Sequence, residues 1–203
     1  MNEFVVCGWY TPDYKVWADR LLSNLTALGL PHDFVVVPKP IAEWESITLL
    51  KPQQVLAAMD RNPGKTIIFL DVDCEVLSAS AMVSLSEIIG DVGFYLRTKF
   101  RRSGALKWSP RSGTMVFKPS LNARKFVEMW RDLSVSAPAY AVDQDMLAIT
   151  LGKHPWSITF IDIRHCAIEG DKVSDPWILH YSASENVHKA SHVKRWAVRQ
   201  FYS

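Results

Sequence analysis

The feature that most constrains the fold is an alternation of strand and helix patterns along residues 3–73. Apolar runs typical of buried strands lie at 3–9, 33–38 and 65–73, and segments with helix signals separate them at 11–29 and 51–64. In the first helical segment, Thr11 is a candidate cap, Pro12 suits the first helical position and Gly29 ends the pattern. We therefore predict an α/β fold with a mostly parallel central sheet, right-handed crossovers and flanking helices.

The rest of the chain continues in the same style. We expect helices at 78–91, 120–133 and 143–152, and strands at 92–97, 113–119, 156–162 and 177–182. Ser120 is a candidate helix cap, and a basic segment, 98–112, joins the two middle strands. A chain of 203 residues suits one buried core, so we expect a single domain, 1–203, with a basic C-terminal segment, 187–203. The apolar spacing within that segment predicts a docking helix.

Composition indicates a globular protein, because 48% of the residues are hydrophobic and no low-complexity tract interrupts the chain. The first apolar run is short and follows the acidic Glu3, so we expect neither a signal peptide nor a membrane span. Cys7, Cys74 and Cys166 are widely separated and show no zinc-ligand spacing. We interpret these cysteines as reduced thiols, and we therefore expect a cytoplasmic protein.

The net charge of +2 conceals an uneven distribution. No acidic residue lies between Asp91 and Glu128, whereas nine Lys or Arg residues do, and the chain after Glu185 is also free of acids. Charge runs are usually solvated faces, and the alternative is a surface that binds the phosphates of a nucleotide or of a polymer.

Two carboxylates, Asp71 and Asp73, end the apolar strand 65–73 with one residue between them. Side chains two apart on a strand point to the same face, and two like charges held together repel unless a positive group sits between them. A divalent cation is the simplest such group. In open α/β sheets ligands bind beyond the carboxyl ends of the strands, so we expect segments 8–14, 71–76 and 179–184 to converge there.

In this order of motifs the chain resembles the GT-A glycosyltransferases, which carry a DxD motif at the end of a central strand. The matching stretches are GWYTPDY, KPQQVLAAMD, DVD, SGTMVFKPS, DQD and a late LHYS. The resemblance implies a nucleotide-sugar donor, for which we expect a UDP-sugar, and a Mn²⁺ or Mg²⁺ ion. It implies that Asp73 binds the cation directly, that Asp71 binds the ribose or the cation through water, and that His180 completes the metal ligands.

The resemblance also implies roles for other donor-site residues. Tyr10, Thr11 and Tyr14 would hold the base and ribose, Arg97 the diphosphate, and Gly113, beside Ser112, would let the sugar lie against the backbone. Lys51 would face the donor, although an exposed lysine is the ordinary interpretation. Helix capping and core packing are the ordinary interpretations of the first three residues.

The DQD residues, Asp143, Gln144 and Asp145, would point at the sugar, either as a general base in an inverting enzyme or as sugar-binding groups in a retaining one. We favour the retaining mechanism, and helix capping alone would also explain Asp143. The sequence departs from one retaining family in its ending, because YSASENVHK follows His180 where an HxxGxxKPW-like motif is expected.

The acceptor is less defined. Basic and aromatic residues of the segment 98–112 are candidates to bind it, namely Arg101, Arg102, Lys107, Trp108 and Arg111. Such a surface suits a polyanion, either nucleic acid with hydroxylated bases, such as hydroxymethylated DNA modified by a phage enzyme in its host's cytoplasm, or an acidic glycan.

Two alternatives remain open. One is a haloacid-dehalogenase-like phosphatase with Asp71 as nucleophile, although Cys74 and Glu75 stand where that family has Gly-Thr. The other is a non-catalytic, basic nucleic-acid-binding module.

Overall fold

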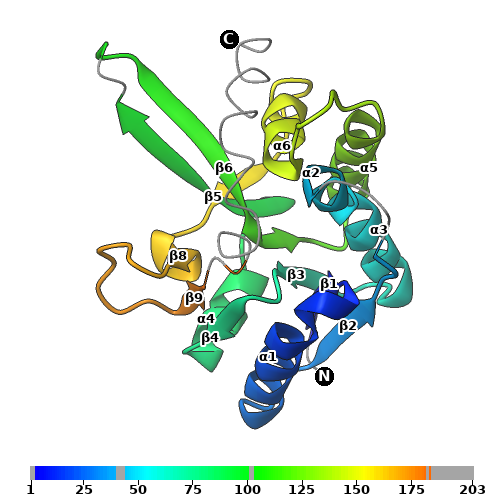
Figure 1. The fold of residues 1–203 in the computed structure, drawn as a ribbon, viewed down its shortest axis with the longest axis vertical. Coiled ribbons are helices and arrows are strands. Elements are labelled where there is room, and N and C mark those ends of the chain that lie inside the picture. Colours follow the sequence, from blue (N-terminus) through cyan, green and yellow to red (C-terminus); the bar gives the residue numbers. More distant parts are fainter. Residues whose placement is uncertain (1–2, 40–43, 101–102, 182, 184–203) are drawn as a thin grey trace.

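The computed structural model describes residues 3–39, 44–100, 103–181 and 183 (Figure 1). Its strands are β1 (Phe4–Tyr10), β2 (His32–Val36), β3 (Thr66–Leu70), β4 (Cys74–Val76), β5 (Val92–Phe100), β6 (Leu106–Phe117), β7 (Ile158–Phe160), β8 (Ala167–Ile168) and β9 (Ile178–His180). Its α-helices are α1 (Lys15–Ala27), α2 (Trp44–Thr48), α3 (Lys51–Arg61), α4 (Ala79–Ser86), α5 (Leu121–Val135) and α6 (Asp143–Leu151). Short 3₁₀ turns occupy Pro12–Tyr14 and Ile163–His165.

The main sheet has the strand order β2-β1-β3-β6-β5-β7. β1 pairs in parallel with β2 and β3, and β7 pairs in parallel with β5, whereas β6 runs antiparallel to both of its neighbours, β3 and β5. The expected α/β fold with a mostly parallel central sheet is confirmed. β6 is the strand that departs from the parallel pattern.

Helices cover both faces of the main sheet, because its inner strands are apolar on both sides. Ile67 and Phe69 of β3 pack into a cluster with residues of α3, α5 and α6, while Ile68 and Leu70 pack into a second cluster with residues of α1 and α4. This alternation is the period of two expected of a strand buried on both faces. All five residues of β3 are buried.

A second, smaller sheet, with the order β4-β9-β8, lies beside the end of β3. β4 begins one residue after Asp73 and pairs antiparallel with β9, so that Cys74 is in register with His180. The sequence predicted neither β4 nor β8, because strands of two or three residues are too short for a periodicity signal. The small sheet brings the late histidine to the carboxyl end of β3.

Two of the three expected helix caps are wrong. The side chain of Thr11 donates a hydrogen bond to Asp13 and makes no cap bond to a backbone N–H, since a 3₁₀ turn precedes α1. Asp143 is the first residue of α6, and Val142 precedes it as the N-cap residue. Ser120 is confirmed as a cap, because its Oγ accepts the backbone N–H of Ala123 at 3.0 Å.

Strands β5 and β6 form a long hairpin that projects beyond the rest of the molecule (Figure 1). The segment 98–112, expected as a connection, supplies much of both arms. The register shifts between Phe94, which pairs with Met115, and Tyr95, which pairs with Arg111. β6 therefore bulges over residues 112–114. Bulges redirect side chains and are frequent beside active sites.

Among the residues that the structure describes, no helix has both the length and the apolar composition needed to cross a bilayer. Arg101, Arg102 and the predicted C-terminal helix of segment 187–203 lie outside the described residues.

Candidate active site

Three chain segments meet at the carboxyl end of β3. The backbone N–H of Asp71 donates to the carbonyl of Gly113 in the β6 bulge, and the N–H of Tyr181, just after β9, donates to the carbonyl of Asp73. The side chain of Asp73 also accepts the N–H of Ala183 at 2.9 Å. The loop after β3 is thus tied to β6 on one side and to the chain after β9 on the other.

Gly113 lies between Asp71 and His180. A Cβ atom built on this glycine would lie 2.8 Å from Cε1 of His180, 3.0 Å from its Nδ1 and 3.3 Å from Oδ2 of Asp71. The missing side chain therefore lets an imidazole and a carboxylate converge on the bulge. Nε2 of His180 is 2.9 Å from the hydroxyl of the buried Thr114, so a hydrogen bond holds the ring.

Lys51 is buried against two carboxylates. Its ammonium group lies 2.9 Å from Oδ1 of Asp71 and 2.9 Å from Oδ2 of Asp143, and it also donates to the carbonyl and hydroxyl oxygens of Ser112. The hydroxyl of Ser112 donates to Asp143 at 2.6 Å. With 6% of its surface exposed, Lys51 does not fit the ordinary interpretation as an exposed lysine. Burial is tolerated because three polar partners surround the charge.

The electrostatics of this cluster follow from burial and from the balance of charges. The carboxylates of Asp143 and Asp71 raise the pKa of Lys51 despite its burial, so the ammonium stays charged. Burial raises the pKa of Asp71, and Asp73 and Asp143 add repulsion that Lys51 only partly offsets. The Asp71 side chain is 35% exposed, so it is open to solvent on one side while protein surrounds it on the others.

The DQD residues have three different environments. Asp143 is buried, and its carbonyl accepts the indole N–H of Trp130 at 3.0 Å while its own N–H donates to Thr48. Gln144 is exposed. The carboxylate of Asp145 accepts the N–H of Val142 and so stabilises the start of α6. The structure brings Asp143, rather than its two neighbours, to Lys51 and Asp71.

The predicted base-binding residues follow β1. Tyr10 is its last residue, Thr11 is buried, and Tyr14 is half-buried in the adjoining 3₁₀ turn. Burial raises the pKa of Tyr14, and the nearby charge of Asp73 raises it further, while a hydrogen bond with Trp44 opposes the shift. Tyr14 therefore contacts Trp44 of α2 and lies close enough to Asp73 to feel its charge.

The predicted metal-binding groups, Asp71, Asp73 and His180, come from segments joined by the hydrogen bonds above. Within the described residues, however, no three His, Cys, Asp or Glu side chains already surround a common point. The carboxylates suit Mn²⁺ or Mg²⁺, and the imidazole adds a softer nitrogen ligand. Because Gly113 has no side chain, Asp71 and His180 can both approach the same point of the bulge.

The basic hairpin residues are not equivalent. Arg111 is buried and donates to the carbonyl of Cys166 at 2.7 Å and to Asp171 at 3.1 Å, so it ties the hairpin to the small sheet. Arg97 and Lys107 are partly exposed, and Trp108 is exposed. The structure thus gives Arg111 a different environment from Lys107 and Trp108.

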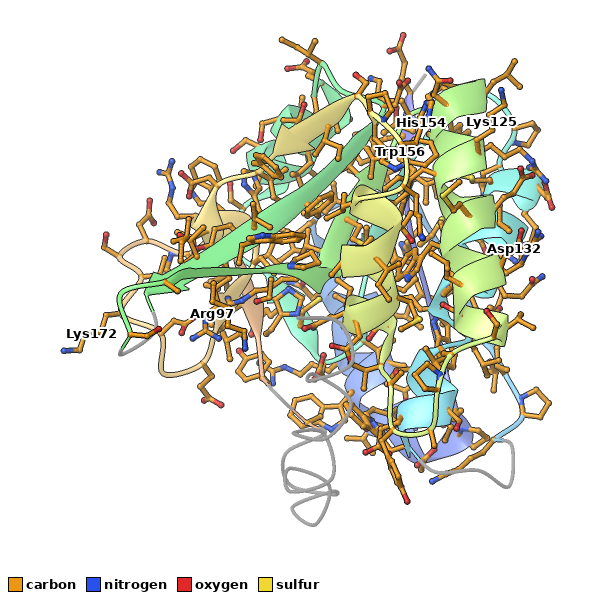
Figure 2. The ribbon with its side chains drawn as sticks, turned by 90° about the horizontal axis from the view of Figure 1, so that it is seen from above. Arg97, Lys125, Asp132, His154, Trp156 and Lys172 are labelled. Carbon is orange, nitrogen blue, oxygen red and sulfur yellow. The ribbon has the colours of Figure 1, made fainter. Side chains whose placement is uncertain are left out.

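A groove of about 680 Å³ lies elsewhere, along the outer side of α5. Figure 2 shows Lys125, Asp132, His154 and Trp156 around it, with Arg97 and Lys172 on the opposite, hairpin side of the molecule. No predicted site residue lines this groove. We place the candidate site at Asp71 because buried, mutually bonded charged groups gather there.

Sequence reasoning missed three groups that support this site: Thr48 and Trp130, which contact Asp143, and Thr114, which contacts His180. Thr114 follows Gly113 directly and was within reach of a sequence prediction. Thr48 lies on the unpredicted α2, and Trp130 lies in the predicted helix 120–133, where an apolar pattern does not distinguish it from ordinary core residues.

Comparisons with known proteins place the fold. No protein-family model matches the chain, and no curated protein matches its sequence. Among solved structures, a glycosyltransferase involved in glycosylation of the major capsid of PBCV-1 matches with a TM-score of 0.67 and 12% identity, over 97% of this chain and 98% of its own. The galactosyltransferase LgtC, in complex with donor and acceptor sugar analogues, matches with a TM-score of 0.56 and 12% identity, over 98% and 94%.

The apo form of the glycosyltransferase GlyE from Streptococcus pneumoniae TIGR4 matches with a TM-score of 0.61 and 14% identity. That match covers 100% of this chain and 63% of GlyE, so the chain spans less than two thirds of that protein. At these identities the likeness shows the fold. The chain therefore has the α/β fold of these glycosyltransferases.

Proposed function

We propose that the protein is a metal-dependent glycosyltransferase that moves a sugar from a nucleotide-sugar donor, expected to be a UDP-sugar, to a hydroxyl acceptor. One observation carries the proposal: the two aspartates of the DVD motif, His180 and the Lys51–Asp143 pair gather around the β6 bulge at the carboxyl end of β3. Ligands of open α/β sheets bind at this edge. The glycosyltransferase fold supports the same assignment.

Asp71, Asp73 and His180 would hold the Mn²⁺ or Mg²⁺ ion, which, when bound, neutralises the charge that develops on the departing diphosphate. His180 and Thr114 share a hydrogen bond through Nε2, and in the tautomer that donates its Nε2–H to the Thr114 hydroxyl, Nδ1 keeps its lone pair for a cation on the side of Gly113. Ala183 fixes one oxygen of Asp73 through a backbone hydrogen bond. These contacts would hold the ligands in place before the donor binds.

Tyr10, Thr11 and Tyr14 would bind the nucleoside, because they follow the strand beside β3 and Tyr14 lies near Asp73. Asp143 would accept hydrogen bonds from hydroxyls of the donor sugar, with Gln144 beside it. Arg97 would contact the diphosphate. Gly113 would let the sugar approach the backbone of the bulge.

A retaining mechanism fits the environments of the two DQD acids better than an inverting one. A general base must have a free carboxylate near the acceptor hydroxyl. Asp143 is paired with the charged Lys51 and accepts from Ser112, and Asp145 accepts the N–H that begins α6. Both acids are engaged, so holding sugar hydroxyls is the better-supported role.

The acceptor stays a prediction, and a polyanion such as hydroxymethylated DNA or an acidic glycan is the class that the basic residues suggest. We also expect the enzyme to work in the cytoplasm, because Cys7, Cys74 and Cys166 are all free thiols.

Isothermal titration of UDP with and without Mn²⁺ tests the proposal. We expect metal-dependent binding that Asp73→Asn abolishes and that Asp132→Asn, a change in an exposed carboxylate on α5, leaves intact. Slow hydrolysis of one member of a panel of nucleotide sugars would then identify the donor.

Two results would contradict the proposal. Metal-independent UDP binding, unchanged in Asp73→Asn, would exclude the metal site. Release of phosphate from an aryl phosphate, lost in Asp71→Asn and accompanied by no nucleotide-sugar hydrolysis, would favour the phosphatase.

A further inference from the structure

The outer part of the β5–β6 hairpin has two chemically different faces. Its arms pair residue by residue from Tyr95 with Arg111 to Phe100 with Leu106. Paired residues share a face and successive residues alternate between faces. One face therefore carries Leu96, Thr98, Leu106, Trp108 and Pro110, and the other carries Tyr95, Arg97, Lys107, Ser109 and Arg111. The first is apolar and the second is basic.

The apolar face is anchored at its base and open toward its tip. Pro110 is buried and Leu96 packs against the core cluster that includes α5 and α6. Farther out, Leu106 is 57% exposed and Trp108 is 47% exposed. Two large apolar side chains exposed together on a projecting element indicate an interaction surface rather than ordinary surface scatter.

The basic face, like the apolar one, differs between its base and its outer part. At the base, Asp171 neutralises Arg111. Farther out on the same face lie Arg97 and Lys107, at the level of Trp108 and Leu106 on the opposite face. The outer part of the hairpin thus combines exposed apolar groups with basic ones.

The apolar and the basic side chains lie on opposite faces of the hairpin, and this arrangement favours one class of binding partner over another. A nucleic-acid strand stacks its bases on aromatic rings and sets its phosphates against cations from the same groove, so it would need both on one face. A lipid surface needs the opposite: an apolar face that enters the boundary between headgroups and acyl chains, backed by Lys and Arg side chains whose long stems reach the phosphates.

We propose that the β5–β6 hairpin binds the surface of membranes that contain anionic lipids, with Leu106 and Trp108 entering the interface and Arg97 and Lys107 contacting the headgroups. Arg97 is shared with the proposed donor site, whereas Leu106, Trp108 and Lys107 are not assigned to that site, and membrane binding does not depend on the proposed transferase activity. In the cytoplasm, the anionic inner leaflet is the surface available to it.

Flotation of the full-length protein with vesicles tests the proposal. We expect binding to vesicles of phosphatidylcholine mixed with phosphatidylglycerol, weak binding to phosphatidylcholine alone, and loss of binding at high salt. The double change Leu106→Ser/Trp108→Ala should weaken binding by roughly tenfold or more, because it removes the inserted apolar groups. Lys107→Ser, which leaves Arg97 in place, should weaken it by about fivefold.

The matched control is Leu121→Ser, which removes a leucine that is 78% exposed at the start of α5, away from the hairpin. It should leave vesicle binding unchanged. Circular dichroism reports whether each variant is folded, and the vesicle result does not depend on whether UDP binds.

Four outcomes would overturn the proposal. The protein could bind neutral and anionic vesicles equally, or the Leu106→Ser/Trp108→Ala variant could bind vesicles as well as the parent does. The hairpin could instead form a concentration-dependent dimer that this double change dissociates. Finally, the protein could fail to bind vesicles and bind single-stranded DNA in a way that requires Trp108.

Discussion

At Gly113 the backbone of β6 passes close to the side chains of Asp71 and His180, because this residue has no side chain of its own. Gly113→Ala would place a methyl group 2.8 Å from the imidazole of His180 and 3.3 Å from Asp71. We expect this variant to fold and to lose Mn²⁺-dependent UDP binding, since the ring must move from the position that Thr114 holds. Titration calorimetry measures the loss.

Gly152→Ala is the control for that change. Its added Cβ would meet only the carbonyl of Ile149 at 3.6 Å, an ordinary contact. Unchanged UDP binding in both variants would contradict the role assigned to Gly113.

Lys51 offers a test of the buried charge cluster. Lys51→Met leaves Asp143 buried and Asp71 partly buried without their cation, so we expect a loss of about 3 kcal/mol in the free energy of unfolding at neutral pH. Urea unfolding measures it. Lys15→Met, which removes an exposed pair with Asp19, should have no measurable effect.

The pH dependence of that loss has a defined sign. Without Lys51, the folded-state pKa of Asp71, already raised by burial, rises further above that of the unfolded chain. An acid with a raised folded-state pKa destabilises the fold when ionised, and this effect disappears as protons bind. The deficit of Lys51→Met should therefore shrink as pH falls from neutral to mildly acidic values. A deficit that grows would contradict this account.

Sequence reasoning at the residue scale identified the site residues by their order along the chain, but not their contacts. Asp71 and Asp73 are recognisable because they follow an apolar strand. The burial of Lys51 was not predictable, because its partners Asp143 and Ser112 lie far away in sequence and β6 presents Ser112 only through the bulge.

Among the elements, the start of α6 carries two carboxylates with different roles. Asp145 stabilises the helix start, whereas Asp143 contacts Lys51 in the candidate site. Asp145→Ala removes the acceptor for the N–H of Val142 and should cost about 1 kcal/mol in stability. Gln144→Ala, at the exposed neighbouring position, should be close to neutral. Thermal unfolding measures both. A large loss of activity in Asp145→Ala with unchanged stability would instead make Asp145 the general base.

Long, periodic elements were predictable and short or irregular ones were not. The patterns at 3–9, 65–73 and 120–133 correspond to β1, β3 and α5. α2 has five residues and β4 three, too few to show a period. The basic segment looked like a loop because alternating Lys, Arg and apolar residues were read as charge, whereas the same alternation is typical of a strand with two unlike faces.

On the scale of the whole molecule, the reactivity of the three cysteine thiols measures how readily solvent and reagents reach the core. Cys7, Cys74 and Cys166 are all buried. Burial raises the pKa of Cys7 to about 12 and that of Cys74 well above its ordinary value, so little reactive thiolate exists at neutral pH. We expect Ellman's reagent to react slowly with the native protein and rapidly after denaturation. Fast reaction of the native protein would mean that the sheet opens readily.

The α/β fold class could be predicted because strand and helix patterns alternate over the first third of the chain. The sequence did not predict the reversal of β6, since strand direction follows from connections. Only residues 101–105 separate β5 from β6 in the sequence, which favours antiparallel pairing of the two strands, and β6 then inserts beside β3.

The bond between Asp73 and Ala183 holds the chain after β9 beside the DVD aspartates. β1, in contrast, starts at Phe4, at the end of the strand opposite to Tyr10 and hence away from them. A fluorophore attached at the exposed Glu3 would therefore be tethered far from where substrates bind. Glu3 is the position at which to attach a reporter for any of these measurements.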